Sequence, residues 1–142
     1  MMNTTHRIAE IFAKREGWTS EDGTYTRAGI ETGDLAGMIM LAARRGPNLG
    51  ARADAVDFVF VADGDGVWGI GRAVKVTTRP GREGAPHRCF LVDPYDVPAE
   101  VRKALVGHPR PHPFRAGGGV QYGVLVDGVV TMDAHKREPV AL

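Results

Sequence analysis

The sequence contains one cysteine, few aromatic residues, and no long run of hydrophobic residues or of charges of one sign. Because Cys89 is alone, it excludes an intramolecular disulfide and a zinc site built from several cysteines. No apolar segment reaches the length of a membrane span, and the N-terminal residues lack the apolar centre of a secretory signal. We therefore expect a cytoplasmic protein with no membrane partner.

The composition is that of an ordinary globular protein. Its 142 residues favour one domain, and 43% hydrophobic with 25% charged residues is typical of a folded chain. The formal net charge of +1 does not by itself indicate nucleic acid, although arginine, which suits phosphate better than lysine, is the commoner base. We expect a single domain over 1–142, with a helical part over 1–50, a β-rich part over 55–132 and a tail over 133–142.

Two N-terminal helices are predicted from apolar residues at helical spacing. The first is expected to begin at Thr4 or Thr5 and to run to about Glu16, with one apolar stripe formed by Ile8, Ile11 and Phe12. The second is expected to begin near Thr32 or Asp34 and to end at Gly46-Pro47, with a stripe formed by Leu35, Met38, Ile39 and Ala42. Arg44 and Arg45 lie in its last turn, where cations suit the helix dipole.

The stretch from Phe58 to Thr77 predicts two strands joined by a turn. Its first four residues are all apolar, as in a strand that is buried on both faces, and Asp63–Gly66 can reverse the chain. The return strand alternates: one face is expected to carry Trp68, Ile70, Arg72, Val74 and Val76, and the other Val67, Gly69, Gly71, Ala73 and Lys75. The glycines leave the second face nearly bare, which indicates a bend, a bulge or a close neighbour.

The C-terminal half predicts a strand, a short helix and a second hairpin. The strand is expected over 88–92, the helix after Asp96-Val97-Pro98, and the hairpin over 120–132 around an Asp127-Gly128 turn. This order favours an α+β fold, in which a small curved or closed mixed β-sheet is flanked by two N-terminal helices and one short helix.

The histidines and the cysteine leave catalytic alternatives open. His108 and His112 could form part of a metal site in a hydrolase, but they lie in a Pro-rich loop and a site would need further ligands such as His87. Cys89 and His87 would share a face of a strand, although a lone cysteine among apolar residues is more often an inert core thiol. No glycine-rich segment has the ending of a phosphate-binding loop. We expect no resident metal, no cofactor and a protein that is not an enzyme.

Several arginines lie in or beside loops that flank the predicted sheet: Arg79, Arg82, Arg88, Arg110 and Arg115. Guanidinium groups in loops can position a nucleic-acid backbone, and aromatic side chains such as Trp18, Tyr95 or Phe114 could stack on a base. The alternative is a set of solvated surface charges.

The order of motifs in the middle of the chain resembles the PUA-like superfamily, in particular its YTH, EVE and ASCH domains. The hairpin over 58–76 carries glycines in similar places, at Gly64, Gly66, Gly69 and Gly71. An apolar strand, Asp96-Val97-Pro98, a short helix and the Pro-containing loop over 109–115 then follow as they do in YTH domains. Only Trp18 and Trp68 are available for the tryptophan cage in which YTH domains hold a methylated base.

The resemblance implies a small curved β-barrel that binds single-stranded or modified RNA or DNA and holds a modified or flipped base in a pocket. It also implies that Arg115 contacts phosphate. From the residues we add Arg79 and Arg82 as positioning groups, and Trp68, Phe90 and Tyr95 as walls of a pocket beside the Gly69/Gly71 face. The alternatives are a protein-interaction or assembly module and the metal-dependent hydrolase described above.

Overall fold

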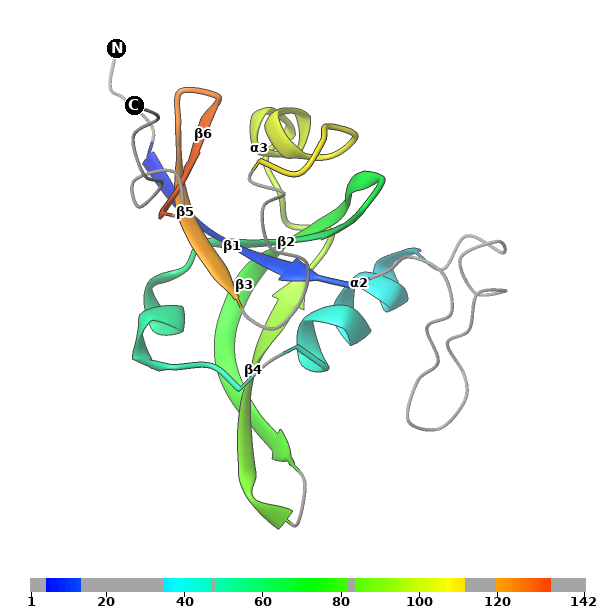
Figure 1. The fold of residues 1–142 in the computed structure, drawn as a ribbon, viewed down its shortest axis with the longest axis vertical. Helices are drawn as coiled ribbons and strands as arrows, with labels where there is room; N and C mark the ends of the chain where they lie inside the picture. Colours follow the sequence, from blue (N-terminus) through cyan, green and yellow to red (C-terminus); the bar gives the residue numbers. More distant parts are fainter. Residues whose placement is uncertain (1–4, 14–34, 47, 82–83, 112–119, 134–142) are drawn as a thin grey trace, which may run out of the picture.

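The computed structural model describes residues 5–13, 35–46, 48–81, 84–111 and 120–133. Within these residues six strands form one open mixed sheet in the order β4-β3-β2-β1-β5-β6 (Figure 1). The strands are β1 (Thr5–Phe12), β2 (Phe58–Asp63), β3 (Gly66–Pro80), β4 (Pro86–Asp93), β5 (Gln121–Val126) and β6 (Val129–Met132). The helices are α2 (Leu35–Arg44), the 3-10 turn η1 (Ala51–Ala55) and α3 (Ala99–Leu105). β1 and β2 are parallel, and the other neighbouring pairs are antiparallel.

The helix predicted from Thr4 or Thr5 to about Glu16 is wrong, because Thr5–Phe12 form β1; residues 14–16 lie outside the described residues. Its apolar residues have helical spacing, yet four consecutive side chains from Ile8 to Ile11 are buried. β1 lies between β2 and β5 with both of its faces covered, so it does not show the alternation that reveals a half-exposed strand. The N-terminal part over 1–50 is therefore not purely helical.

The predicted closed or barrel-like sheet is also wrong. β4 and β6 lie at opposite edges of the sheet, and among the described residues no pairing joins them. Among the described residues two α-helices flank the sheet, α2 and α3, and α2 matches the second predicted helix. None of the described helices is both long and apolar enough to span a membrane.

The two faces of the sheet carry separate cores. On one face α2 and η1 pack over side chains that include Ala9, Ile11, Val59 and Val61. On the other face α3 packs over side chains that include Ile8, Phe58, Phe60 and Ile70. The alternation predicted along β3 fails because the register shifts at Val61/Ala62 and again at Ala73/Lys75. Consequently Trp68 lies in the α2 core whereas Ile70 lies in the α3 core.

The bare strip of β3 at Gly69 is filled by a helix. A Cβ atom on Gly69 would lie 2.5 Å from Cγ1 of Ile39, which belongs to α2. On Gly71 it would lie 3.1 Å from Cβ of Val92 in β4. The glycines therefore let α2 and β4 approach β3 closely, as the sequence suggested for a close neighbour.

A buried ion pair joins β1 to the segment that follows α3. Arg110 donates to the two carboxylate oxygens of Glu10, from Nη2 at 2.6 Å and from Nε at 3.3 Å, and both side chains are at most 5% exposed. The guanidinium group also lies 4.7 Å from the centre of the Phe12 ring. Main-chain hydrogen bonds between Val67 and residues 107 and 108 hold the same segment against β3. Together these contacts fix the position of α3.

The second hairpin has the turn that its sequence predicts. Asp127 and Gly128 both adopt positive φ, 50° and 81°, as a two-residue type I′ turn requires. The register Val126↔Val129 follows directly from this turn. β5 also pairs with β1, so the hairpin extends the sheet beyond β1.

Gly69→Ala should lower the free energy of unfolding by about 1–3 kcal/mol, because the new methyl group overlaps Ile39 in a packed core. Gly50→Ala is the matched control, since nothing lies within 4 Å of its Cβ position and we expect little change. Urea titration measures both variants. In the Ile39→Ala background the cost of Gly69→Ala should largely vanish; an unchanged cost would rule out this contact as the reason for the glycine.

Glu10→Gln should destabilise the protein by about 3–5 kcal/mol, because it leaves a buried guanidinium group without its counter-charge. Glu100→Gln, at an exposed carboxylate of α3, should change stability by no more than about 0.5 kcal/mol. Chemical denaturation monitored by tryptophan fluorescence measures both. The double variant Glu10→Leu/Arg110→Met should recover most of the loss, and a double variant as unstable as Glu10→Gln would contradict this account.

Candidate functional site

The aromatic residues predicted as pocket walls lie apart in the structure. Trp68 is 8% exposed and donates its indole N–H to the Ala13 carbonyl at 2.8 Å, and Phe90 is buried in the same core. Tyr95 is 83% exposed in the turn after β4. The Gly69/Gly71 strip beside which the base was expected is occupied by α2 and β4. These three rings therefore do not form one pocket in this structure.

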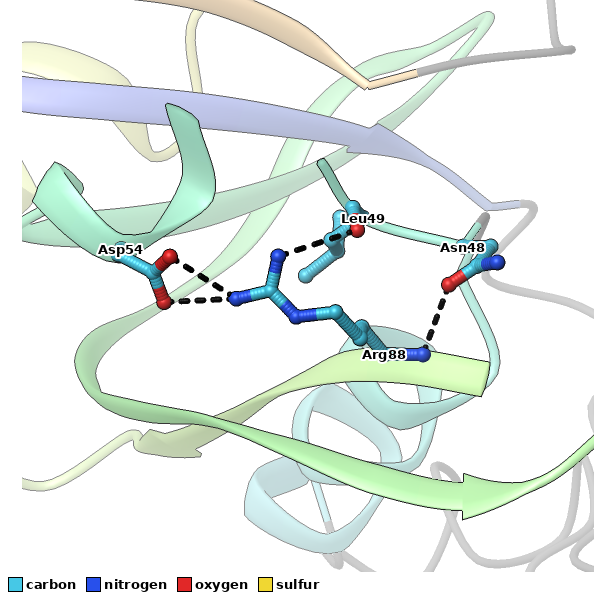
Figure 2. Close-up of polar contacts among 4 residues, drawn as sticks. All are labelled: Asn48, Leu49, Asp54 and Arg88. Carbon is cyan, nitrogen blue, oxygen red and sulfur yellow. Dashed lines mark hydrogen bonds and ion pairs between the residues drawn. The ribbon is translucent and has the colours of Figure 1, made fainter. Parts of the chain in front are cut away.

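Several arginines are bound to carboxylates. Arg88 of β4 donates from Nη2 to both oxygens of Asp54 in η1, at 2.7 and 2.9 Å, and from Nη1 to the Leu49 carbonyl (Figure 2). Its main-chain N–H donates to the Asn48 side chain, so Arg88 ties η1 and the preceding loop to β4. Elsewhere, ion pairs join Arg110 to Glu10, Arg72 to Asp96 and Arg52 to Asp133. The charges of these four arginines are therefore paired within the protein.

Arg79 is bound differently. Its Nε donates to the main-chain carbonyl of Arg44 at 2.7 Å, and its Nη1 donates to the carbonyl of Pro80 at 3.3 Å. Within the described ranges, no carboxylate lies within ion-pair distance of Arg79 or of Arg44, which is exposed at the end of α2. Arg45 is the next residue and is also exposed. These three residues, Arg44, Arg45 and Arg79, form the arginine cluster.

The arginine cluster lies beside the far part of a projecting arm, where β3 ends and β4 begins. Figure 1 shows the far end of the β3–β4 hairpin extending beyond the other strands and the helices. Thr78 pairs with Arg88, Arg79 with His87 and Pro80 with Pro86 along this arm. His87 donates from Nε2 to the Gly46 carbonyl at 2.9 Å, which attaches the arm to the end of α2. The predicted positioning residues Arg82 and Arg115 lie outside the described residues.

A groove lies on the opposite face of the sheet, between α3 and the β5–β6 hairpin. Its volume is about 850 Å³, and its lining includes His6, Val101, Ala104, Leu125 and Val130. The His6 ring packs edge-on against Phe58, with 5.2 Å between ring centres. In the part of the chain that the structure describes, its Nε2 is buried without a hydrogen-bond partner. An unpaired buried nitrogen costs about 1–3 kcal/mol, so the groove floor holds an unsatisfied polar atom.

The residues proposed for catalysis or for a metal site are engaged in other contacts. His87 and His108 each donate from Nε2 to a main-chain carbonyl, that of Gly46 and that of Lys103 respectively. His112 lies outside the described residues, and the described residues contain no group of three metal-ligating side chains. Burial raises the pKa of the Cys89 thiol, against the opposite influence of the Arg79 and Arg44 charges. Cys89 therefore favours the neutral thiol over the reactive thiolate.

Comparison of the chain with models of protein families, with curated proteins and with solved structures found no match. The resemblance to PUA-like domains thus gains no support from these comparisons.

The sequence patterns predicted no binding role for His6, Arg44 or Arg45. His6 was not recognised because its segment was predicted to be a helix, whereas in β1 it lines the groove. Arg44-Arg45 was noted only for its effect on the helix dipole. The signal that could have found the cluster was an Arg-Arg pair at a helix end combined with Arg79 in a long hairpin.

Cys89 should react with a disulfide reagent such as DTNB at pH 8 only when the protein unfolds, since the residue is 1% exposed and its thiol pKa is raised. A Val74→Cys variant provides the control, because position 74 is 55% exposed and should react at once. Reaction of Cys89 in the native protein as fast as that of the control thiol would contradict the buried environment.

Proposed function

We propose that this protein is a non-catalytic nucleic-acid-binding module that contacts a duplex through the β3–β4 arm and the arginine cluster. One observation carries the proposal: Arg79 and Arg44 have no carboxylate partner among the described residues, whereas four other arginines are paired. A guanidinium group without a counter-charge is available for a phosphate, which it can bind through two N–H groups.

The side chain of Arg79 is already ordered in an orientation from which it could bind a phosphate. Its bonds to the carbonyls of Arg44 and Pro80 hold the side chain in one orientation without neutralising its charge. Among the described residues its second terminal nitrogen, Nη2, has no acceptor. A phosphate would therefore meet an ordered guanidinium group, and binding would not have to order a flexible side chain.

The shape of the arm favours a duplex over a single strand. A two-stranded β-ribbon fits the major groove of B-DNA, which is about 12 Å wide. The projecting part of the β3–β4 hairpin is such a ribbon (Figure 1). Arg79 belongs to its next-to-last residue pair, Arg79↔His87, so its guanidinium group would lie near the phosphates that border the groove. Single-strand binding instead commonly uses aromatic platforms, and Trp68 and Phe90 are buried. This differs from the single-stranded or modified partner expected from the sequence.

A protein-interaction module is the second candidate, and a different observation favours it. Val74 and Leu91 are large apolar side chains that are 55% and 43% exposed. Val74 lies at the register shift beside the Lys75↔Leu91 pair, so the two residues are close on the arm. β4 is also an edge strand, to which a partner strand could pair.

Arg79→Ala and Arg44→Ala should each weaken binding to a duplex DNA of about 20 base pairs. Each should lower the slope of log affinity against log salt concentration by about one unit, because each removes one phosphate contact. Fluorescence anisotropy at several salt concentrations measures the slope, with single-stranded DNA and duplex RNA for comparison.

Arg7→Ala is the matched control, since Arg7 is exposed on β1 rather than on the arm. It should leave both the affinity and the salt slope nearly unchanged. If Arg79→Ala and Arg44→Ala both keep the wild-type slope of log affinity against log salt concentration, the arginine cluster is not part of the interface. If the wild-type protein binds none of these nucleic acids even at low salt, the proposed function is wrong and the protein-interaction candidate takes its place.

A further inference from the structure

On the α3 face of the sheet, a groove lies between the helix and the β5–β6 hairpin. α3 packs over the part of the face formed by β2 and β3, where Phe60 and Ile70 lie. On β1, β5 and β6 a row of side chains crosses three strands, because His6 is paired with Leu125 and Leu125 with Val130. These three side chains line the groove, so the row forms its floor.

The walls of the groove are mostly apolar. α3 contributes Val101 and Ala104 to one wall, and Pro109 and Pro111 continue it after the helix. The opposite wall is the end of the β5–β6 hairpin around Gly128. A volume of about 850 Å³ is within the range of sites that bind small molecules. A flat molecule that lies on the floor would contact apolar side chains on three sides.

The charged side chains that line the groove disfavour the binding of a highly charged ligand. Lys103 is a base, while Glu100 and Asp127 are acids, so the two signs are mixed along the lining. A phosphate or another polyanion would meet two carboxylates. This arrangement suits a neutral molecule, and it distinguishes the groove from the arginine cluster on the arm.

His6 supplies a polar group at the floor. Its ring lines the groove, and its buried Nε2 has no partner among the described residues. A neutral imidazole ring has one donor and one acceptor nitrogen, and a half-turn of the ring exchanges the positions of its nitrogens and carbons. Nε2 can therefore serve as a donor or an acceptor, and because it is buried, the ring has to turn toward the groove to bond a molecule there.

From these features we propose that the groove is a binding site for a small, neutral, planar heteroaromatic molecule. The apolar floor and walls would contact the ring faces and edges, and His6 would form a hydrogen bond to a ring nitrogen. This site is independent of the proposed nucleic-acid surface, which lies on the arm.

Quinoline and indole are suitable probes, because both are neutral and planar at pH 7 and their ring nitrogens are respectively an acceptor and a donor. Titration of the ¹⁵N-labelled full chain should give saturable amide shifts at Ala104, Leu125 and Val130. For molecules of this size we expect dissociation constants of about a millimolar or lower. His6→Phe keeps a ring but removes its nitrogens, and should weaken binding of either probe about tenfold.

Two variants test the place of binding. Ala104→Trp should fill the groove and abolish the shifts, and Val130→Trp serves the same purpose if the first variant does not fold. Val74→Trp adds the same side chain on the arm and should bind the probes as the wild type does. The proposal is overturned if neither probe saturates, if a folded groove-filling variant still binds, or if His6→Phe binds both probes with unchanged affinity.

Discussion

The ion pair between Glu10 and Arg110 decides how one face of this sheet is covered. Glu10 lies on β1 in the middle of the sheet, where an unpaired carboxylate would be strongly unfavourable. Arg110 supplies the counter-charge, and it lies five residues after the end of α3. The pair therefore holds the segment that follows α3 against the sheet, and the groove lies between this helix and the β5–β6 hairpin.

The other face is covered by a different kind of contact. There α2 packs directly on β3, because Gly69 has no side chain and Ile39 occupies that space. The end of α2 is then attached to the arm through the carbonyls of Arg44 and Gly46. The same packing that fills the glycine strip thus brings Arg44, Arg45 and Arg79 together. Both proposed sites follow from how a helix is fastened to one face of the sheet.

Local patterns predicted several elements of this fold correctly. The all-apolar run of β2, the Asp127-Gly128 turn and the apolar stripe of α2 each depend mainly on nearby residues. β1 was mistaken for a helix because a central strand buried on both faces has no period of two, and Ile8, Ile11 and Phe12 happened to match a helical period. The open sheet was missed as well, since strand order depends on contacts between residues far apart in the chain.

The candidate sites were harder to predict for the same reason. Arg79 was singled out from the sequence, but its difference from Arg88 lies in its partners: Arg88 binds Asp54, whereas Arg79 binds carbonyl groups. The ion pair of Glu10 joins residues 100 positions apart, which no spacing rule reveals. His6 gains its place in the groove only through its pairing with Leu125 of β5.

Mapping a DNA duplex onto the protein by NMR tests the central claim most directly. A duplex of about 20 base pairs added to the ¹⁵N-labelled full chain at low salt should shift the amides of the arm and of the last turn of α2. The amides of α3 and the β5–β6 hairpin should remain nearly unchanged, since α3 packs on the face opposite α2 and the hairpin forms the edge of the sheet opposite the arm. Shifts centred on α3 and β5–β6, or no shifts at all, would contradict the assignment of the arm as the nucleic-acid surface.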